Sequence, residues 1–132
     1  MATKASWLPF PVQRLSQEVD RLFKELIYRP WARVSVWSPQ VDLYETETVV
    51  ILEADLPGVE VQEISVAVEH KELVVQGKRV LEQKRAEDTV YRRERPAGQF
   101  VRWLHLPTFV DRERIRVEYY DGVLRVTLPK LQ

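Results

Sequence analysis

The spacing of apolar residues changes once along the chain, close to residue 40. Before that point the stretch "PFPVQRLSQEVDRLFKELIYRP" repeats apolar residues at intervals of three and four, which predicts one amphipathic helix. Pro11 can stand in the first turn of this helix, and Pro30 ends it. Beyond residue 40 the period is two, which is typical of β-strands. The pattern therefore predicts an N-terminal arm, partly helical, over residues 1–39 and a β-domain over residues 40–130.

The apolar stripe of this predicted helix has two main interpretations. It consists of Leu15, Val19, Leu22, Phe23, Leu26 and Ile27. The stripe can pack permanently, on the β-domain or on its copy in a dimer, or it can be exposed reversibly to partner proteins. A helix on a membrane surface fits less well, because the polar face mixes acidic and basic residues.

Short strands follow one another through the β-domain. "QVDLYETETVVILEADLPG" predicts a short strand, a turn and a longer strand that stops at Pro57-Gly58. "EISVAVEHKELVVQGKR" predicts two strands around a turn near His70-Lys71, and "QFVRWLHLP" predicts one strand that Pro107 closes. Seven or eight short strands with no helix between them indicate an antiparallel sandwich or barrel.

The stretch "EYYDGVLRVTLPK" is a strong hairpin signal. A two-residue type I′ turn needs positive φ at both central residues, which Asp tolerates and Gly adopts freely. If Asp121-Gly122 is the loop, Tyr119 faces Leu124, Val117 faces Val126 and Ile115 faces Leu128. These six side chains then share one face, and Pro129 stops the last strand.

Two charged features interrupt the apolar pattern. The segment "EQKRAEDTVYRRERPAG" contains a strand-like piece, Thr89–Arg93, within a stretch whose mixed charges favour a solvated loop over a phosphate-binding patch. Arg102 alternates with Phe100, Leu104 and Leu106, so its charge falls on an apolar face, where it is costly unless paired. Arg102 either meets a carboxylate from a second chain or loop, or extends its charged end to an edge.

Composition narrows the classes of protein. The chain has 132 residues, 20 basic and 20 acidic, and no cysteine, which argues against a dedicated nucleic-acid binder, disulfides and a Cys-based zinc site. The first residues lack the apolar run of a signal peptide, and no stretch approaches the roughly 20 apolar residues of a membrane span. We expect a soluble, cytoplasmic protein with no membrane span. Six of the 13 aromatic residues lie in the arm, which has a small basic excess.

Signals of catalysis are scarce. His70 and His105 lack metal-ligand spacing, the four glycines lie at or next to turns or strand ends, and no serine lies in a nucleophile elbow. The pairs Asp42 with Glu45 and Glu53 with Asp55 are expected by chance in a chain that is 30% charged. We therefore expect no enzyme activity, no cofactor and no metal.

Three motifs together resemble the small heat-shock proteins of the α-crystallin family. "EADLPGVEVQEISVAVEHKELVVQGKR" is similar to the family's strand, Leu-Pro-Gly and two-strand segment. "YRRERPAGQFVRWLHLP" resembles its Arg-rich loop followed by Gly-x-Phe-x-Arg and Leu-Pro, and "VEYYDGVLRVTLPK" its Ala-x-x-x-Asn-Gly-Val-Leu signature. Val117 stands where Ala is usual, and Asp121 replaces Asn. The resemblance implies an immunoglobulin-like antiparallel β-sandwich.

In function, the resemblance implies an ATP-independent holdase that binds partly unfolded client proteins and prevents their aggregation. The arm residues that we expect to bind clients are Trp7, Phe10, Leu15, Val19, Leu22, Phe23, Leu26, Trp31 and Trp37. The alternative is a co-chaperone adaptor of the p23 type, which binds one folded partner but has little need for an aromatic arm or an Arg-rich loop. A third class, an enzyme or ligand-binding sandwich, needs a polar cluster that the sequence lacks.

The resemblance also implies two interfaces between copies. The loop would cross to a neighbouring sandwich and form a homodimer through Val90, Tyr91, Arg92 and Arg93, together with Arg102. An edge groove formed by Ile64, Val66, Val68, Ile115, Val117 and Tyr119 would receive a partner's C-terminal Ile-x-Ile tail.

Only residues 131–132 follow the last strand, so we expect a vestigial tail and a dimer or small assembly. Val34-Ser35-Val36 can substitute for the missing tail by adding to the edge at Ile115, Val117 and Tyr119, or it can be the first strand of the sandwich.

Overall fold

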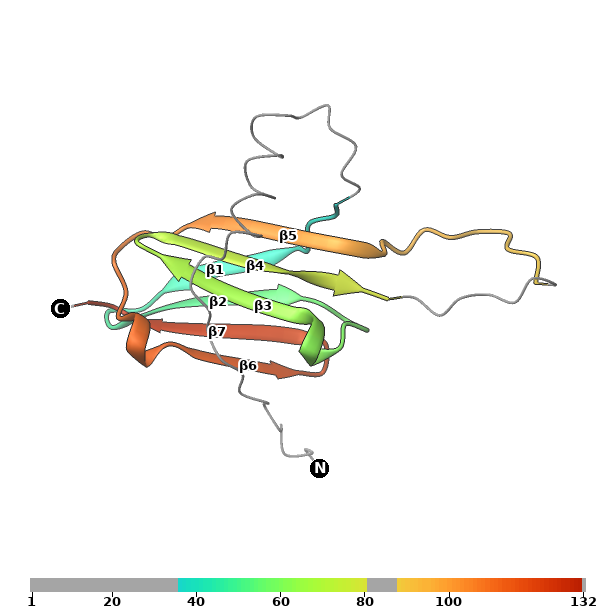
Figure 1. The fold of residues 1–132 in the computed structure, drawn as a ribbon. Coiled ribbons are helices and arrows are strands. Elements are labelled where there is room, and N and C mark those ends of the chain that lie inside the picture. The colour runs from blue at the N-terminus through green and yellow to red at the C-terminus, as the bar shows by residue number, and fades with distance from the viewer. Residues whose placement is uncertain (1–35, 81–87, 132) are drawn as a thin grey trace, which may run out of the picture.

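The computed structural model describes residues 36–80 and 88–131, in which seven strands form two antiparallel sheets packed face to face (Figure 1). The larger sheet has the order β1 (Val41–Glu45), β2 (Val49–Asp55), β7 (Val123–Pro129) and β6 (Arg116–Tyr120). The smaller has the order β3 (Ile64–Glu69), β4 (Glu72–Arg79) and β5 (Gly98–His105). Two short 3₁₀ helices, η1 (Val61–Glu63) and η2 (Arg112–Arg114), precede β3 and β6.

This architecture confirms the predicted all-β fold and selects the sandwich over the barrel. The strands on either side of Pro57-Gly58 and of Asp121-Gly122 lie where the alternation places them. The predicted arm helix lies outside the described residues.

The main core is a layer of apolar side chains between the two sheets. In the larger sheet, β2 and β7 alternate buried and partly exposed residues, so that Val50, Leu52, Leu124 and Val126 point inward. Phe100 of β5 is fully buried against the same layer. A clean alternation of this kind is expected of an antiparallel sheet with one wet face.

The smaller sheet also carries a small apolar patch on its outer face. Ala67, Val74 and Val101 occupy the outward positions at the middle of β3, β4 and β5, yet they are only 3%, 0% and 7% exposed. Val74 and Val101 form a second apolar cluster with the partly buried Val36 and Trp103. The sandwich therefore has a buried patch on its outer face in addition to its core.

The final hairpin has the predicted register. Tyr119 pairs with Leu124 and Val117 with Val126, and φ is 54° at Asp121 and 79° at Gly122. One predicted pair is absent from the ladder, because β6 begins at Arg116. Ile115 instead follows η2 and packs, partly buried, against the core.

The turn of this hairpin docks on the loop after β2. The Leu56 amide donates to the Gly122 carbonyl at 2.7 Å, and the Tyr119 hydroxyl lies 2.6 Å from the Leu56 carbonyl and 2.8 Å from that of Val59. A Cβ on Gly122 would lie 3.0 Å from the Pro57 Cα, so space as well as φ favours glycine here. The loop and the hairpin therefore fix one another.

Gly77 is required by a close approach and not by its backbone angles. A Cβ at this position would lie 2.0 Å from the carbonyl oxygen of Glu63 and 2.8 Å from the Phe100 ring. We expect Gly77→Ala to lower the free energy of unfolding by about 3 kcal/mol, because backbone cannot move aside as a flexible side chain can. Urea denaturation measures this loss.

Gly98→Ala is the matched control for this variant. Gly98 has φ of 86° and no atom within 4 Å of an added Cβ, so only the backbone conformation opposes the substitution. Its expected cost is about 1 kcal/mol. Equal costs for the two variants would contradict the steric role of Gly77.

Tyr119→Phe tests the tie between the hairpin and the loop after β2. We expect a loss of about 1–2 kcal/mol in the free energy of unfolding, because the Val59 carbonyl loses the hydroxyl that it accepts from. Urea denaturation at neutral pH measures the difference from the parent chain.

The same pair of chains tests the titration of Tyr119. Burial raises the pKa of the Tyr119 hydroxyl, against the opposing effects of the Arg79 charge and the hydrogen bond to Val59. The unfolded chain therefore loses this proton first as the pH rises, so the stabilisation is complete below about pH 10 and falls above it. The advantage of the parent chain over Tyr119→Phe should shrink from that pH upward; a constant difference would contradict the pKa shift.

Candidate interaction surfaces

The sandwich ends in four edge strands, two in each sheet. β1 and β6 flank the larger sheet, and β3 and β5 flank the smaller one. β3 and β6 lie toward one side of the sandwich in Figure 1, with β5 on the opposite side. The edge position predicted for the first strand of the final hairpin is confirmed. Edge strands present unpaired backbone groups and are natural sites of association.

Trp37 lies along the edge of β5. Its amide donates to the Gln99 carbonyl and its carbonyl accepts from the Val101 amide, both at 3.1 Å, so that it forms a parallel bridge to Phe100. The Trp37 ring lies 5.1 Å from the Phe100 ring, and the indole Nε1 donates to the Gly98 carbonyl at 3.1 Å. The sequence placed Trp37 among the client-binding residues, whereas the structure places it on its own sandwich.

Arg79 secures this contact from the end of β4. Its guanidinium lies 4.4 Å from the centre of the Trp37 ring and donates to the Pro96 carbonyl at 2.9 Å. Arg79 is only 7% exposed, and its Nε has no hydrogen-bond partner. Burial, followed by the charge of Arg95, lowers the pKa of Arg79. One side chain therefore joins the base of the arm, β4 and the loop before β5.

The position of Val36 bears on whether Val34-Ser35-Val36 adds to the edge of β6 in place of a C-terminal tail. Val34 and Ser35 lie outside the described residues. Val36 packs on the outer face of the smaller sheet with Val74, Val101 and Trp103, so in this chain it does not lie on the edge of β6. Residues 36 and 37 straddle the edge of β5, with Val36 in the outer cluster and Trp37 against the main core.

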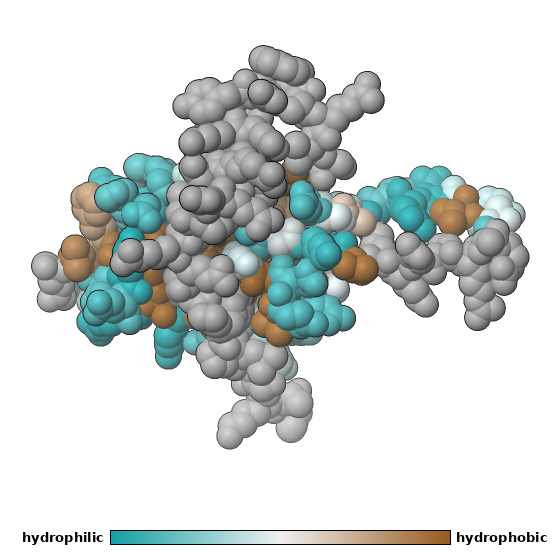
Figure 2. Space-filling view, in the orientation of Figure 1, coloured by the Kyte–Doolittle hydropathy of each residue, from teal (hydrophilic) through white to brown (hydrophobic). Residues whose placement is uncertain are grey.

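The described part of the Arg-rich loop, residues 88–97, extends away from the sandwich (Figure 1). Thr89–Arg93 has no strand partner among residues 36–80 and 88–131. Val90 is 48% and Tyr91 94% exposed, and Figure 2 shows this largely hydrophilic loop interrupted by hydrophobic atoms. Arg92 pairs with Glu94 at 2.7 Å, but both side chains are well exposed, so the pair contributes little stability. Arg93 is exposed.

Arg102 lies on the inner face of β5, as its alternation predicts. It is directly opposite Val75 of β4, and its Nε is buried with no hydrogen-bond partner. A buried guanidinium nitrogen without an acceptor is unfavourable in an isolated sandwich. The prediction that Arg102 meets a carboxylate of another chain stays a prediction.

The residues of the predicted edge groove are largely part of the core. Val66, Val68 and Val117 are 0–2% exposed and Ile64 is 5% exposed. Ile115 and Tyr119 are partly buried against them. β3 and β6 lie at sheet edges as expected, but the side chains of these residues already pack together in the core. Docking of a tail at this site stays a prediction.

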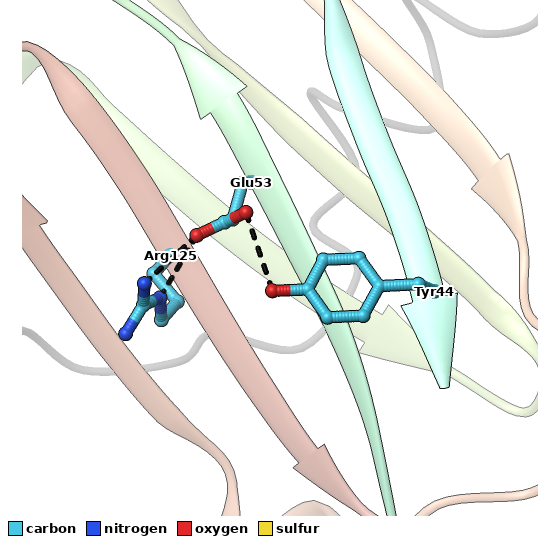
Figure 3. A network of polar contacts seen from close by, with 3 residues as sticks. All are labelled: Tyr44, Glu53 and Arg125. Carbon is cyan, nitrogen blue, oxygen red and sulfur yellow. Dashed lines mark hydrogen bonds and ion pairs between the residues drawn. The ribbon is translucent and has the colours of Figure 1, made fainter. Parts of the chain in front are cut away.

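The outer face of the larger sheet carries a polar network and not a catalytic pair (Figure 3). Arg125 donates through two nitrogens to Glu53 Oε2, at 3.1 and 2.9 Å, and the Tyr44 hydroxyl donates to Glu53 Oε1 at 3.3 Å. Desolvation, followed by the negative charge of Glu53, raises the pKa of Tyr44. Glu53 is thus a structural acceptor that ties three strands.

The two histidines belong to the smaller sheet. His70 sits in the turn between β3 and β4 with φ of 54°, and His105 Nδ1 lies 3.0 Å from Glu72 Oε1. Within residues 36–80 and 88–131, no group of three His, Asp or Glu residues could hold a metal ion. Over the same residues no helix is long and apolar enough to span a bilayer. The cytoplasmic location stays a prediction.

Sequence reasoning missed the buried Arg79 and the cluster around Trp103. The Trp103 indole donates to Glu72 Oε2 at 2.5 Å, so that Glu72 joins an indole and an imidazole on the outer face. The available signal for this face was Val101 and Trp103, two apolar residues that alternate with the inward positions of β5. The sequence gives no comparable signal for Arg79.

Comparison with known proteins finds a match to the family described as Hsp20/alpha crystallin over residues 42–132. The "17.6 kDa class I heat shock protein 1" of Arabidopsis thaliana is 33% identical over 111 residues, which cover 83% of this chain and 72% of the relative. "Spore protein SP21" of Stigmatella aurantiaca is 34% identical over 128 residues, 94% of this chain and 75% of the relative.

Solved structures show the same fold. Heat shock protein 16.0 from Schizosaccharomyces pombe is 32% identical, with a TM-score of 0.68 over 73% of this chain and 89% of its own. A small heat-shock protein from Xylella fastidiosa, described as having a distinct high order structure, is 33% identical, with a TM-score of 0.64 over 73% of this chain and 88% of its own. These neighbours have the same kind of sandwich.

Proposed function

The chain belongs to the Hsp20/alpha crystallin family of small heat shock proteins, and from this premise we propose that it is an ATP-independent holdase that keeps partly unfolded client proteins from aggregating. The family supports a chaperone role. Binding needs no turnover chemistry, because burial of apolar surface contributes about 25 cal/mol per Å² without sequence specificity. The polar networks of the described residues have structural partners and serve no reaction in this proposal.

The observation that carries this proposal is the completeness of the sandwich without its arm. Among the described residues the core extends from Trp37 to Leu128, and Trp37 and Arg79 attach the base of the arm to the edge of β5. We infer that the arm is not needed to fill this core and that its apolar residues are available for another role. We assign client binding to Trp7, Phe10, Leu15, Val19, Leu22, Phe23, Leu26 and Trp31, and anchoring of the arm to Trp37.

We further propose that two copies associate through the Arg-rich loop and an edge of the partner sandwich. Tyr91 is almost fully exposed within one chain, and β1 is an edge strand. Adding the Thr89–Arg93 segment to β1 of a second copy would pair backbone groups of both and bury Val90 or Tyr91. Dimerisation would also bring a second chain close to Arg102, whose buried Nε needs an acceptor.

Removal of residues 1–35 tests the role of the arm. Each apolar side chain buried against a client contributes roughly 1.5–3 kcal/mol, so loss of all eight should require at least about tenfold more protein for equal suppression of aggregation. Light scattering from a heat-labile enzyme, with and without ATP, measures this activity. The truncated chain should keep the cooperative unfolding of its sandwich.

Undiminished protection by the truncated chain would move the client-binding site onto the sandwich. No protection by the intact chain, together with tight binding to one folded chaperone, would favour the adaptor of the p23 type. A requirement for ATP would contradict the holdase mechanism.

Deletion of residues 84–94 tests the dimer. We expect the shortened chain to be a monomer, because the segment that pairs with the partner is gone. Mass determination by light scattering at several concentrations measures this change, and Tyr91→Asp should weaken the dimer in the same direction. Glu94→Gln is the control, since it breaks only the exposed pair with Arg92 and should leave the dimer unchanged. A dimer that survives the deletion would overturn the exchange of loops.

A further inference from the structure

The outer face of the smaller sheet carries a buried apolar patch among polar residues. Val74 and Val101 point away from the main core and are nevertheless 0% and 7% exposed. Ala67, which pairs with Val74, is 3% exposed on the same face. The corresponding face of the larger sheet bears Glu53 and Arg125 instead. Buried apolar residues on a second face of a sheet indicate that another part of a protein packs on them.

The segment that precedes β1 brings the N-terminal arm to this face. Val36 already packs there, while Trp37 holds the chain at the edge of β5 through two backbone hydrogen bonds and its indole. The arm therefore joins the sandwich beside Val101, at the margin of the apolar cluster. Trp103, farther along β5 in the same cluster, is held by its hydrogen bond to Glu72.

The predicted arm helix matches this face in size. Residues 15–27 would form a helix about 20 Å long at 1.5 Å per residue. Three strands span roughly 10 Å from edge to edge, and the eight residues of β4 extend about 26 Å. The eight residues 28–35 connect the helix to Val36 and reach up to about 30 Å when extended. One helix can therefore lie across the cluster without strain in the connection.

We propose that the apolar stripe of residues 15–27 docks on the outer face of the smaller sheet of its own chain, over Ala67, Val74 and Val101. This assigns an intramolecular binding site to the sandwich. It rests on the proposed function in one respect only, which is that the docked stripe is the client-binding surface. The docked arm is then withheld from clients, and release exposes two apolar surfaces at once, the stripe and the face that it covered.

Cysteine cross-linking in the full-length chain tests this docking, and the absence of native cysteine makes the result unambiguous. Leu22→Cys is combined with Gln76→Cys, which lies on the outer face of β4 beside the cluster. The matched control combines Leu22→Cys with Thr127→Cys, on the outer face of β7 in the larger sheet; Gln76 and Thr127 are both partly exposed. We expect the Leu22–Gln76 disulfide to form within one chain at least about tenfold faster than the Leu22–Thr127 disulfide.

Isosteric substitution provides a second measurement that does not depend on unfolding. Val74→Thr with Val101→Thr keeps the β-branched shape of both side chains but places hydroxyl groups under the docked stripe. The rate of Leu22–Gln76 cross-linking should fall by about tenfold in this background. Equal rates for the two cysteine pairs, cross-links only between chains, or no effect of the threonine substitutions would overturn the proposal.

The chain cross-linked between Leu22→Cys and Gln76→Cys tests the docking and the client-binding role of the arm separately. If the stripe binds clients, the cross-linked chain should lose suppression of light scattering and regain it when the disulfide is reduced. Specific cross-linking with undiminished protection of clients would leave the docking site in place and contradict the client-binding role of the arm.

Discussion

The layer of apolar side chains between the two sheets is the constraint on which the other features depend. Phe100 is fully buried in this layer, and its ring fits there because Gly77, directly opposite on β4, has no side chain. The same absence lets the backbone of Glu63 approach β4 and brings η1 down onto the smaller sheet. A side chain at Gly77 would push both η1 and the Phe100 ring away from β4. One glycine therefore affects the packing on both sides of this strand.

Closing the core between two sheets leaves four strand edges, and those of β5, β6 and β1 differ in what they contact. The edge of β5 is partly used by Trp37. The β6 edge belongs to a hairpin that is fixed to the loop after β2 by Tyr119 and Leu56. β1 is short and is the edge to which we assign the partner's loop. A sandwich of this kind can thus assemble through backbone pairing without exposing its core.

Two arginines of the smaller sheet, the buried Arg79 and the partly buried Arg102, place charge near these edges. The buried guanidinium of Arg79 is stabilised by the Trp37 ring and the Pro96 carbonyl, and it thereby holds the base of the arm. Arg102 is placed in the core layer with its Nε unpaired. A charge in such a position is unfavourable unless it has an acceptor. The residue that anchors the base of the arm and the residue that we propose contacts a second chain therefore share the inner face of the smaller sheet.

The sequence alone determined the strand positions, the inward residues of β2 and β7, and the register of the final hairpin. These follow from a period of two and from the positive φ that Asp121-Gly122 permits, both of which are local properties. It could not determine that Trp37 packs on its own sandwich, because its hydrogen bond to Gly98 spans 61 residues. The burial of Arg79 and the steric need for Gly77 likewise depend on which strands become neighbours. The outward residues Val74 and Val101 are buried as well, and only the arrangement of distant segments in space decides whether such positions are wet or covered.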